Sequence, residues 1–180
     1  MGGQQMMIYF LAIVVPLIST GVRAEDKTGW AISFGIGGSM IRDTDGDDTF
    51  RANEFVYNWG PEYRYSERWA LGVDFFGIGE GTDDFNGVVT TIDVGGLELR
   101  GRYIFPLSDS VEMYGRLGYA AYFADVEPGG STAGEGAVTL GLGFDIGQGE
   151  HWTFRLDGRY LQGPSDESGA IVTAGFNYRF

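Results

Sequence analysis

A chain of 180 residues is long enough for one domain. Without cysteine it can form neither disulfide bonds nor thiolate metal sites, and a net charge of −13 argues against nucleic acid as a partner. Its 31 glycines and 15% aromatic residues are typical of many-stranded β-proteins, in which glycine relieves crowding and aromatic rings cover strand faces.

One continuous apolar run, residues 6–20, lies near the start of the chain and contains Pro16. It is short for a membrane-spanning helix, which needs about 20 apolar residues. The small residue Ala24 then precedes two acidic residues. We therefore predict a signal peptide over residues 1–24, cleaved after Ala24, and one exported domain over residues 25–180. Because no Lys or Arg precedes the apolar run, an N-terminal anchor helix is the alternative.

The rest of the sequence alternates apolar and polar residues between polar turns, which predicts β-strands rather than helices. In the fourth segment the apolar positions change phase at Gly95-Gly96, and we predict a β-bulge there. Short turns alternate with acidic loops of about eight to ten residues, such as "RDTDGDDT", "GEGTDDFNG" and "DVEPGGSTAG". The expected strands cover residues 30–41, 50–65, 69–78, 88–105, 111–124, 138–146, 152–160 and 171–180.

The faces opposite the apolar ones carry seven acids and seven arginines, balanced in a chain that is otherwise strongly acidic. Arginine without lysine is typical of a confined ionic network, because the planar guanidinium makes several hydrogen bonds to carboxylates. Unpaired charges in such an interior would cost several kcal/mol each, about 3–5 where a partner is lost. We therefore predict a structural network inside the molecule, formed by Glu54, Glu62, Arg64, Asp74, Glu98, Arg100, Arg102, Glu112, Arg116, Asp145, Arg155, Asp157, Arg159 and Arg179.

If the charges lie inside, the aromatic and aliphatic faces lie outside, against lipid. Only helices and closed barrels satisfy all backbone groups in lipid, so the pattern predicts an all-β fold, an eight-stranded antiparallel up-and-down transmembrane β-barrel. Trp30, Trp69 and Trp152 open odd-numbered strands and meet the aromatic ends of even-numbered ones, which predicts an interfacial girdle at one rim. A soluble barrel with the apolar faces inside is the alternative.

The sequence ends in "FNYRF", which places Phe176, Tyr178 and Phe180 on one strand face. With this ending, the strand number and the turn placement, residues 25–180 resemble the eight-stranded bacterial outer-membrane barrels of the OmpA-like, OmpX and opacity-protein type. The resemblance implies a bacterial outer-membrane location, contact with outer-membrane lipid and lipopolysaccharide, and a monomer. It also implies that Phe176, Tyr178 and Phe180 are the signal read by the outer-membrane barrel assembly machinery.

We find no catalytic or cofactor motif. The single histidine, His151, lies in an expected periplasmic turn, and no serine forms a matching nucleophile motif around it. Asp43, Asp45 and Asp47 are weak candidates for a calcium site, because the later Glu and the glycine placement of a calcium loop are missing.

The sequence thus predicts a non-enzymatic outer-membrane barrel with an envelope-structural or surface-interaction role, its lumen plugged by the Arg/Asp/Glu network. Eight strands leave a lumen that side chains fill. The alternative is transport or binding of a small hydrophobic molecule across the outer membrane, for which the inward residues Phe76, Tyr114, Tyr122 and Leu161 are the candidates. A lipid A-modifying enzyme is the third hypothesis.

Overall fold

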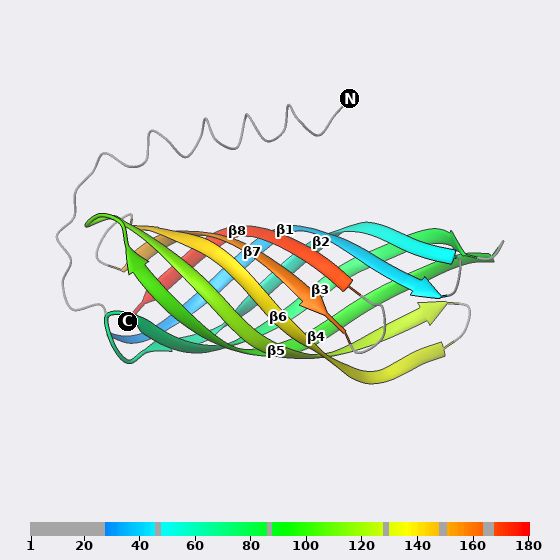
Figure 1. Ribbon diagram of the computed structural model, residues 1–180, viewed down its shortest axis with the longest axis horizontal. Coiled ribbons are helices and arrows are strands. Elements are labelled where there is room, and N and C mark those ends of the chain that lie inside the picture. Colours follow the sequence, from blue (N-terminus) through cyan, green and yellow to red (C-terminus); the bar gives the residue numbers. More distant parts are fainter. Residues whose placement is uncertain (1–27, 46–47, 86–87, 128–129, 148–150, 164–167) are drawn as a thin grey trace, which may run out of the picture.

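The computed structural model describes residues 28–45, 48–85, 88–127, 130–147, 151–163 and 168–180. They form a single cylinder of tilted strands (Figure 1). The strands are β1 (Gly29–Asp45), β2 (Asp48–Arg64), β3 (Trp69–Phe85), β4 (Val88–Pro106), β5 (Val111–Glu127), β6 (Gly130–Gly147), β7 (Trp152–Gln162) and β8 (Ser168–Arg179).

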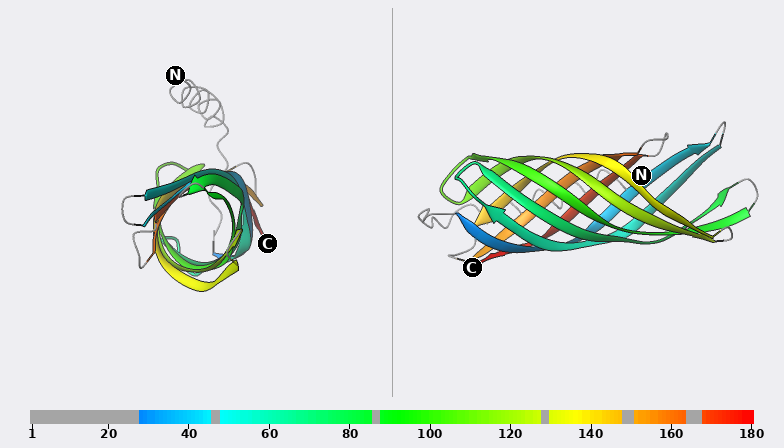
Figure 2. Two further views of the ribbon diagram at one scale, coloured as in Figure 1. Left: turned by 90° about the vertical axis from the view of Figure 1, so that its right-hand side faces the viewer. Right: turned by 90° about the horizontal axis from the view of Figure 1, so that it is seen from below.

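Each strand pairs antiparallel with its neighbours in the sequence, and β8 returns to pair with β1. Phe34 of β1 lies opposite Phe176 of β8 at this closing seam. Seen end-on, the strands form a closed ring (Figure 2). The predicted eight-stranded antiparallel up-and-down barrel is confirmed. The described residues include no helix of the length and hydropathy needed to cross a membrane.

The apolar faces point outward and the charged faces inward. Leu142 on the outer face of β6 is 65% exposed, whereas Arg100 on the inner face of β4 is 2% exposed. An outer surface of exposed Leu, Phe, Tyr and Trp would be an aggregation hazard in water, and it is the surface that lipid requires. The pattern therefore fits the transmembrane interpretation and not the soluble alternative.

Three hairpins are longer than the sequence predicted. We expected loops over "RDTDGDDT", "GEGTDDFNG" and "DVEPGGSTAG", but β1–β2, β3–β4 and β5–β6 continue as paired strands to Asp45, Phe85 and Val126. Asp45 is paired with Asp48, and Phe85 with Val88. The sequence did not predict these extensions because a hairpin surrounded by water needs no apolar face. Its residues therefore lack the alternation of apolar and polar positions that identifies a strand.

The bulge predicted at Gly95-Gly96 is wrong. Gly95 and Gly96 pair without interruption with β3 on one side and β5 on the other. The register shift on this part of the sheet lies in β3, between Ile78 and Gly81. A second shift occurs where β5 pairs with β6, and its extra residue lies in β6 between Thr132 and Glu135. The alternation of inward and outward residues along β4 is unbroken, and the apolar residue Val94, toward the hairpin end, points inward.

Val94 points inward because part of the interior is apolar. Buried side chains from β2, β3, β5 and β8 form a cluster against which three half-buried residues pack. Along β3 this cluster follows the charged Asp74, so it lies nearer the hairpin end of the barrel than the charges do. We call it the apolar layer; it consists of Val56, Phe76, Ile78, Ala120 and Ile171, with Val94, Tyr122 and Leu161 packed against it.

The opposite end of the barrel, where β1 begins and β8 ends, carries the predicted aromatic girdle. Ring pairs join neighbouring strands there: Trp69 and Tyr103 are 4.9 Å apart between centroids, and Trp152 and Tyr178 are 4.8 Å apart. The exposed guanidinium of Arg68 donates to the Tyr103 hydroxyl at 3.2 Å, and this hydrogen bond raises the pKa of Arg68. We call this end the aromatic rim.

Candidate functional site

The candidate site is the set of buried charges in the barrel interior, which we call the charged layer. Arg100 of β4 contacts side chains from three other strands. Its guanidinium binds Asp74 through two hydrogen bonds of 2.8 and 2.9 Å and Glu62 through one of 2.5 Å. It also donates to the Ser33 hydroxyl at 3.4 Å. One side chain thus connects strands β1, β2, β3 and β4.

Glu62 is the point at which three arginines meet. It accepts from Arg100 and, at 2.6 Å, from Arg102, while Arg155 approaches to 3.4 Å. Arg155 and Arg102 are held together from the other side by Asp145, which forms a two-point pair with Arg155 at 2.7 and 3.0 Å. Because every charge in this group has partners of opposite sign, burial in the barrel is tolerated.

A second group lies around Glu98 and Arg116. Glu98 accepts from Arg116 at 2.7 Å, from Arg159 at 2.7 Å and from the Thr139 hydroxyl at 2.6 Å. Arg116 also binds Asp157 at 2.7 Å and reaches Asp74 at 3.2 Å, which links the two groups into one network. The network therefore crosses the interior between strands that are far apart around the barrel wall.

Aromatic rings border this network on its rim side and on its hairpin side. The Tyr114 hydroxyl donates to Asp157 at 2.7 Å, and the guanidinium of Arg102 lies 4.2 Å from the centre of its ring. On the hairpin side, the guanidinium of Arg159 lies 5.1 Å from the centre of the Phe76 ring. Phe76 is thus the contact between the charged layer and the apolar layer.

Nearer the aromatic rim, Arg64 and Glu112 form a separate pair with an N–O distance of 2.9 Å. Arg64 also donates to the carbonyl oxygens of Ser66 and Glu67, so it fastens the β2–β3 turn as well as binding the carboxylate. This pair ties the start of β5 to the end of β2.

Two of the fourteen residues predicted for the interior network lie apart from the rest. Glu54 is half-buried near the hairpin end, and Arg179 is half-buried near the aromatic rim. Neither belongs to an ion pair among the residues whose side chains the structure describes. The structure brings together the other twelve, all buried: Glu62, Arg64, Asp74, Glu98, Arg100, Arg102, Glu112, Arg116, Asp145, Arg155, Asp157 and Arg159.

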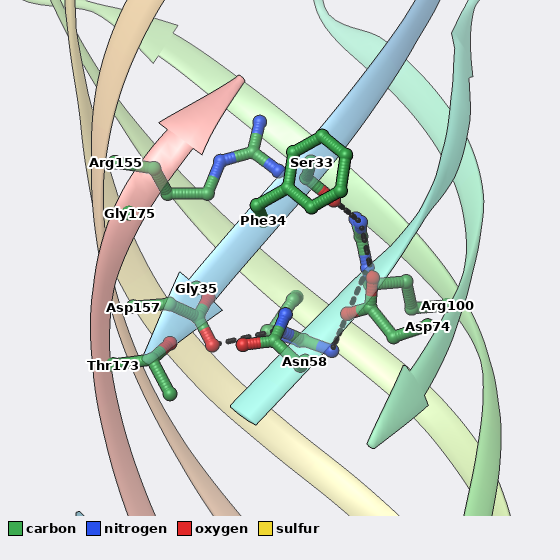
Figure 3. A pocket seen from close by; sticks show the side chains of 11 residues that line it. Ser33, Phe34, Gly35, Asn58, Asp74, Arg100, Arg155, Asp157, Thr173 and Gly175 are labelled. Carbon is green, nitrogen blue, oxygen red and sulfur yellow. Dashed lines mark hydrogen bonds and ion pairs between the residues drawn. The ribbon is translucent and has the colours of Figure 1, made fainter. Parts of the chain in front are cut away.

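A small polar cavity lies beside the charged layer, against the β1–β8 seam (Figure 3). It leaves about 10 Å³ for the centre of a water molecule, close to the minimum that one water needs. Gly35 and Gly175, which face each other across the seam, line this space. The Asn58 side-chain oxygen is buried there without a hydrogen-bond partner among the described residues.

The candidates for other chemistry lie elsewhere. His151 immediately precedes β7 at the aromatic rim, with Nδ1 3.2 Å from the Arg179 carbonyl oxygen and its ring 5.7 Å from that of Tyr178. Asp43 and Asp45 belong to the outer part of β1, and Asp47 lies outside the described residues. No group of three His, Asp or Glu side chains suited to a metal ion occurs in the described part.

Sequence reasoning missed the neutral polar members of the site. Ser33, Thr139, Asn58 and Tyr114 all complete or border the network, and each lies on the inward face of its strand. Their inward parity was the available signal. Tyr114 was instead grouped with Phe76, Tyr122 and Leu161, but it packs with Ala70 and Ile104 on the other side of the charges.

Comparisons with known proteins agree with this architecture. The family model described as "Outer membrane protein beta-barrel domain" matches residues 10–180. The chain is a member of this outer-membrane β-barrel family. A comparison with curated proteins finds no match.

Several solved structures share the fold. Neisserial surface protein A superposes with a TM-score of 0.71 at 14% identity, over 85% of this chain and 98% of that one. OprG of Pseudomonas aeruginosa gives 0.59 at 14% identity, over 88% and 99% of the two chains. Ail, the attachment invasion locus protein of Yersinia pestis, gives 0.56 at 19% identity, over 83% and 98%. The chain therefore covers the whole length of barrels of this kind.

Proposed function

We propose that this protein is a non-enzymatic integral outer-membrane barrel whose charged layer plugs the lumen, and that it serves envelope structure or surface interaction. The observation that carries the proposal is the set of twelve buried charges, ten in one network and two in the Arg64–Glu112 pair, each with an ion-pair partner on another strand. A lumen crossed by paired guanidinium and carboxylate groups offers no continuous water path to a solute.

Planar-bilayer conductance tests the plug. The wild-type protein, purified in detergent, should give no steady conductance. The double variant Arg100→Ala/Arg116→Ala lacks two guanidinium groups in the middle of the lumen and should give measurable ion flow. Arg68→Ala, at an exposed turn, is the matched control and should remain closed. Steady conductance of the wild-type protein would contradict the plug.

The proposal includes recognition by the barrel assembly machinery. Phe176 on the outer face of β8 and Phe180 directly after β8 are exposed, and a partner protein can reach them before the barrel is embedded. Deleting Phe180 should reduce the amount of protein assembled in the outer membrane, while Leu107→Ala in an exposed turn should not. Equal yields of both variants would count against this signal.

A second function, binding or transport of a small hydrophobic molecule, is favoured by the apolar layer. Phe76, Tyr122 and Leu161, three of the four residues predicted for it, meet there. Native mass spectrometry of protein extracted gently from its own membrane tests this. A bound small hydrophobic molecule, lost in a Phe76→Ala variant, would favour transport, and a bare barrel would leave the structural and surface roles.

For the enzyme hypothesis, His151 is the only histidine of the chain. Its exposed position at the aromatic rim, next to a backbone carbonyl, supports a structural turn residue and not a general base. A His151→Ala variant should leave the lipid A of the producing cells chemically unchanged. A change of acylation that depends on His151 would establish catalysis.

A further inference from the structure

Glu54 is an inward residue of β2 that stands apart from the paired charges of the lumen. Val56 of the apolar layer is the next inward residue on that strand. The Glu54 side chain is half-buried, and it belongs to no ion pair among the residues whose side chains the structure describes. The buried acids of the described lumen, by contrast, all have an arginine partner. The Glu54 carboxylate is therefore open to a cation from outside the chain.

The register between strands places Glu54 beside the apolar layer on a second side. Ser39 of β1 lies opposite Glu54 and donates its hydroxyl to the Glu54 carbonyl oxygen at 3.3 Å. On its other side, Ser39 lies opposite Ile171 of β8, which belongs to the apolar layer. Glu54 thus borders this layer along its own strand and across β1, at the hairpin side.

The outer side of the apolar layer is partly exposed. Its buried members are at most 4% exposed, whereas Val94, Tyr122 and Leu161, which pack against them, are only half-buried. Each of these three lies on the hairpin side of a buried inward residue of its own strand, namely Glu98, Ala120 and Arg159. We call Glu54, Val94, Tyr122 and Leu161 together the outer mouth.

The chain around the outer mouth is strongly acidic. The outer parts of the three long hairpins, residues 41–52, 79–93 and 124–137, contain eleven acidic residues against two arginines. In the charged layer, by contrast, acids and arginines balance. A negative surface raises the local concentration of cations and repels anions. The hairpins therefore favour a positively charged ligand at the mouth.

An organic cation suits this mouth better than a metal ion. In the described part of the chain, no three acidic or histidine side chains come together to hold a metal. Val94 and Leu161 offer no oxygen to replace the water around a metal ion, but they can bury an apolar body at about 25 cal/mol per Å². The ring of Tyr122 adds a face that attracts cations. A ligand with both a positive charge and an apolar body therefore uses every part of the mouth.

We propose that the outer mouth binds a small organic cation that carries an apolar body, such as an aryl quaternary ammonium ion. Its charge lies beside Glu54, and its body lies against Val94, Tyr122 and Leu161. The proposal rests on the second function above, the binding of a small hydrophobic molecule, and names the class of that molecule. The ligand stays on the hairpin side of the charged layer, so that binding leaves the lumen closed.

The test is a titration of the full mature protein in phosphatidylcholine nanodiscs, followed by methyl NMR of its Ile, Leu and Val side chains. With phenyltrimethylammonium as the probe, we expect saturable shifts of the Val94, Leu161 and Ile171 signals. Ile104, which lies on the rim side of the charges, should not shift. Benzenesulfonate has the ring with a negative charge, and tetramethylammonium has the charge without the ring. Both should bind at least about tenfold more weakly than the probe.

Glu54→Gln removes the charge of the mouth and keeps its shape. It should weaken binding of phenyltrimethylammonium about fivefold, as expected for one partly solvated ion pair. The matched control Glu67→Gln removes a charge from the exposed β2–β3 turn at the opposite end and should bind as the wild type does. Leu161→Ala, which shortens the apolar wall, should weaken binding of phenyltrimethylammonium but not of tetramethylammonium. The heat-dependent gel shift checks that each variant is folded.

Four results would overturn the proposal. Equal binding of benzenesulfonate would show a site without charge selection, and equal binding of tetramethylammonium would show attraction by the acidic surface alone. Unchanged affinity of Glu54→Gln would remove that carboxylate from the site, and the absence of any shift would show that the mouth is closed to the cation. A neutral hydrophobic molecule found by native mass spectrometry would then leave the second function standing without this ligand class. Steady conductance of the same samples would count against the plug alone.

Discussion

The barrel interior has two unlike halves built on the same alternating strands. In the middle and toward the aromatic rim, most inward residues are paired charges such as Glu62 and Arg100, beside a small cluster of Ala70, Ile104 and Tyr114. Toward the hairpin end, the inward positions of the same strands hold Val56 and Phe76. The comparison shows that an inward residue is enclosed but need not be polar, since either ion pairs or apolar packing can fill a narrow lumen.

The two halves differ in what the loss of one side chain does. In the charged layer, removal of a carboxylate leaves buried arginines with less counter-charge, and the cost includes their desolvation. In the apolar layer, truncation leaves a cavity and loses contacts, but no charge is orphaned. Substitutions in each half, measured in the same lipid vesicles, therefore test whether the distinction is real.

We expect the largest effect from Glu62→Gln, since Arg100, Arg102 and Arg155 share this carboxylate. The free energy of unfolding should fall by about 3–5 kcal/mol. Urea unfolding followed by the heat-dependent gel shift of the folded barrel measures it. Glu67→Gln in the exposed β2–β3 turn is the control and should change stability by less than about 0.5 kcal/mol. An unaltered Glu62→Gln midpoint would mean that the arginines are solvated.

Phe76→Ala should destabilise the apolar layer by about 3 kcal/mol, from lost burial and the cavity that remains. The variant also removes the ring that faces Arg159. The control is Phe75→Ala at the adjacent position, whose side chain points outward. Lipid can fill the space it leaves, so the free energy of unfolding should fall clearly less than in Phe76→Ala. If both variants unfold at the same urea concentration, the inner layer is not packed as the structure has it.

Glu112→Gln should lower the free energy of unfolding by about 1–2 kcal/mol, less than Glu62→Gln. Its partner Arg64 keeps the carbonyl oxygens of Ser66 and Glu67 as acceptors, so the guanidinium is not left bare. The same urea titration measures the difference. An effect as large as that of Glu62→Gln would place the rim pair among the central charges.

The smallest effect concerns the outer surface, where the Tyr57 ring lies over Gly77. A Cβ added to Gly77 would lie 2.4 Å from that ring, which shows how closely it covers the glycine. Tyr57→Ala should cost about 1 kcal/mol, because the ring shields an otherwise bare stretch of strand. Tyr57→Phe retains the ring and should match the wild type. Equal stability of all three would make the contact incidental.

The sequence predicted most of the fold because its information is periodic. Alternation with an outward apolar face, as in Leu140 and Leu142, identifies a membrane strand without any knowledge of its partners. Balanced acids and arginines on the opposite parity likewise identified the inward face. The prediction failed where the two faces of a strand do not differ as expected. The hairpin ends are mostly polar on both faces, and Val94 is an apolar residue that points inward.

The residues by themselves determined the strand number, the direction of each face and twelve of the fourteen charges assigned to the interior, since each follows from order along one strand. Only the tertiary structure decided which charges meet, because Glu62 and Arg155 are 93 positions apart and come together through the tilt and closure of the barrel. It likewise decided that Tyr114 lies on the rim side of the charges and Phe76 on their hairpin side. Height along the barrel axis depends on register between strands, and no single strand carries that information.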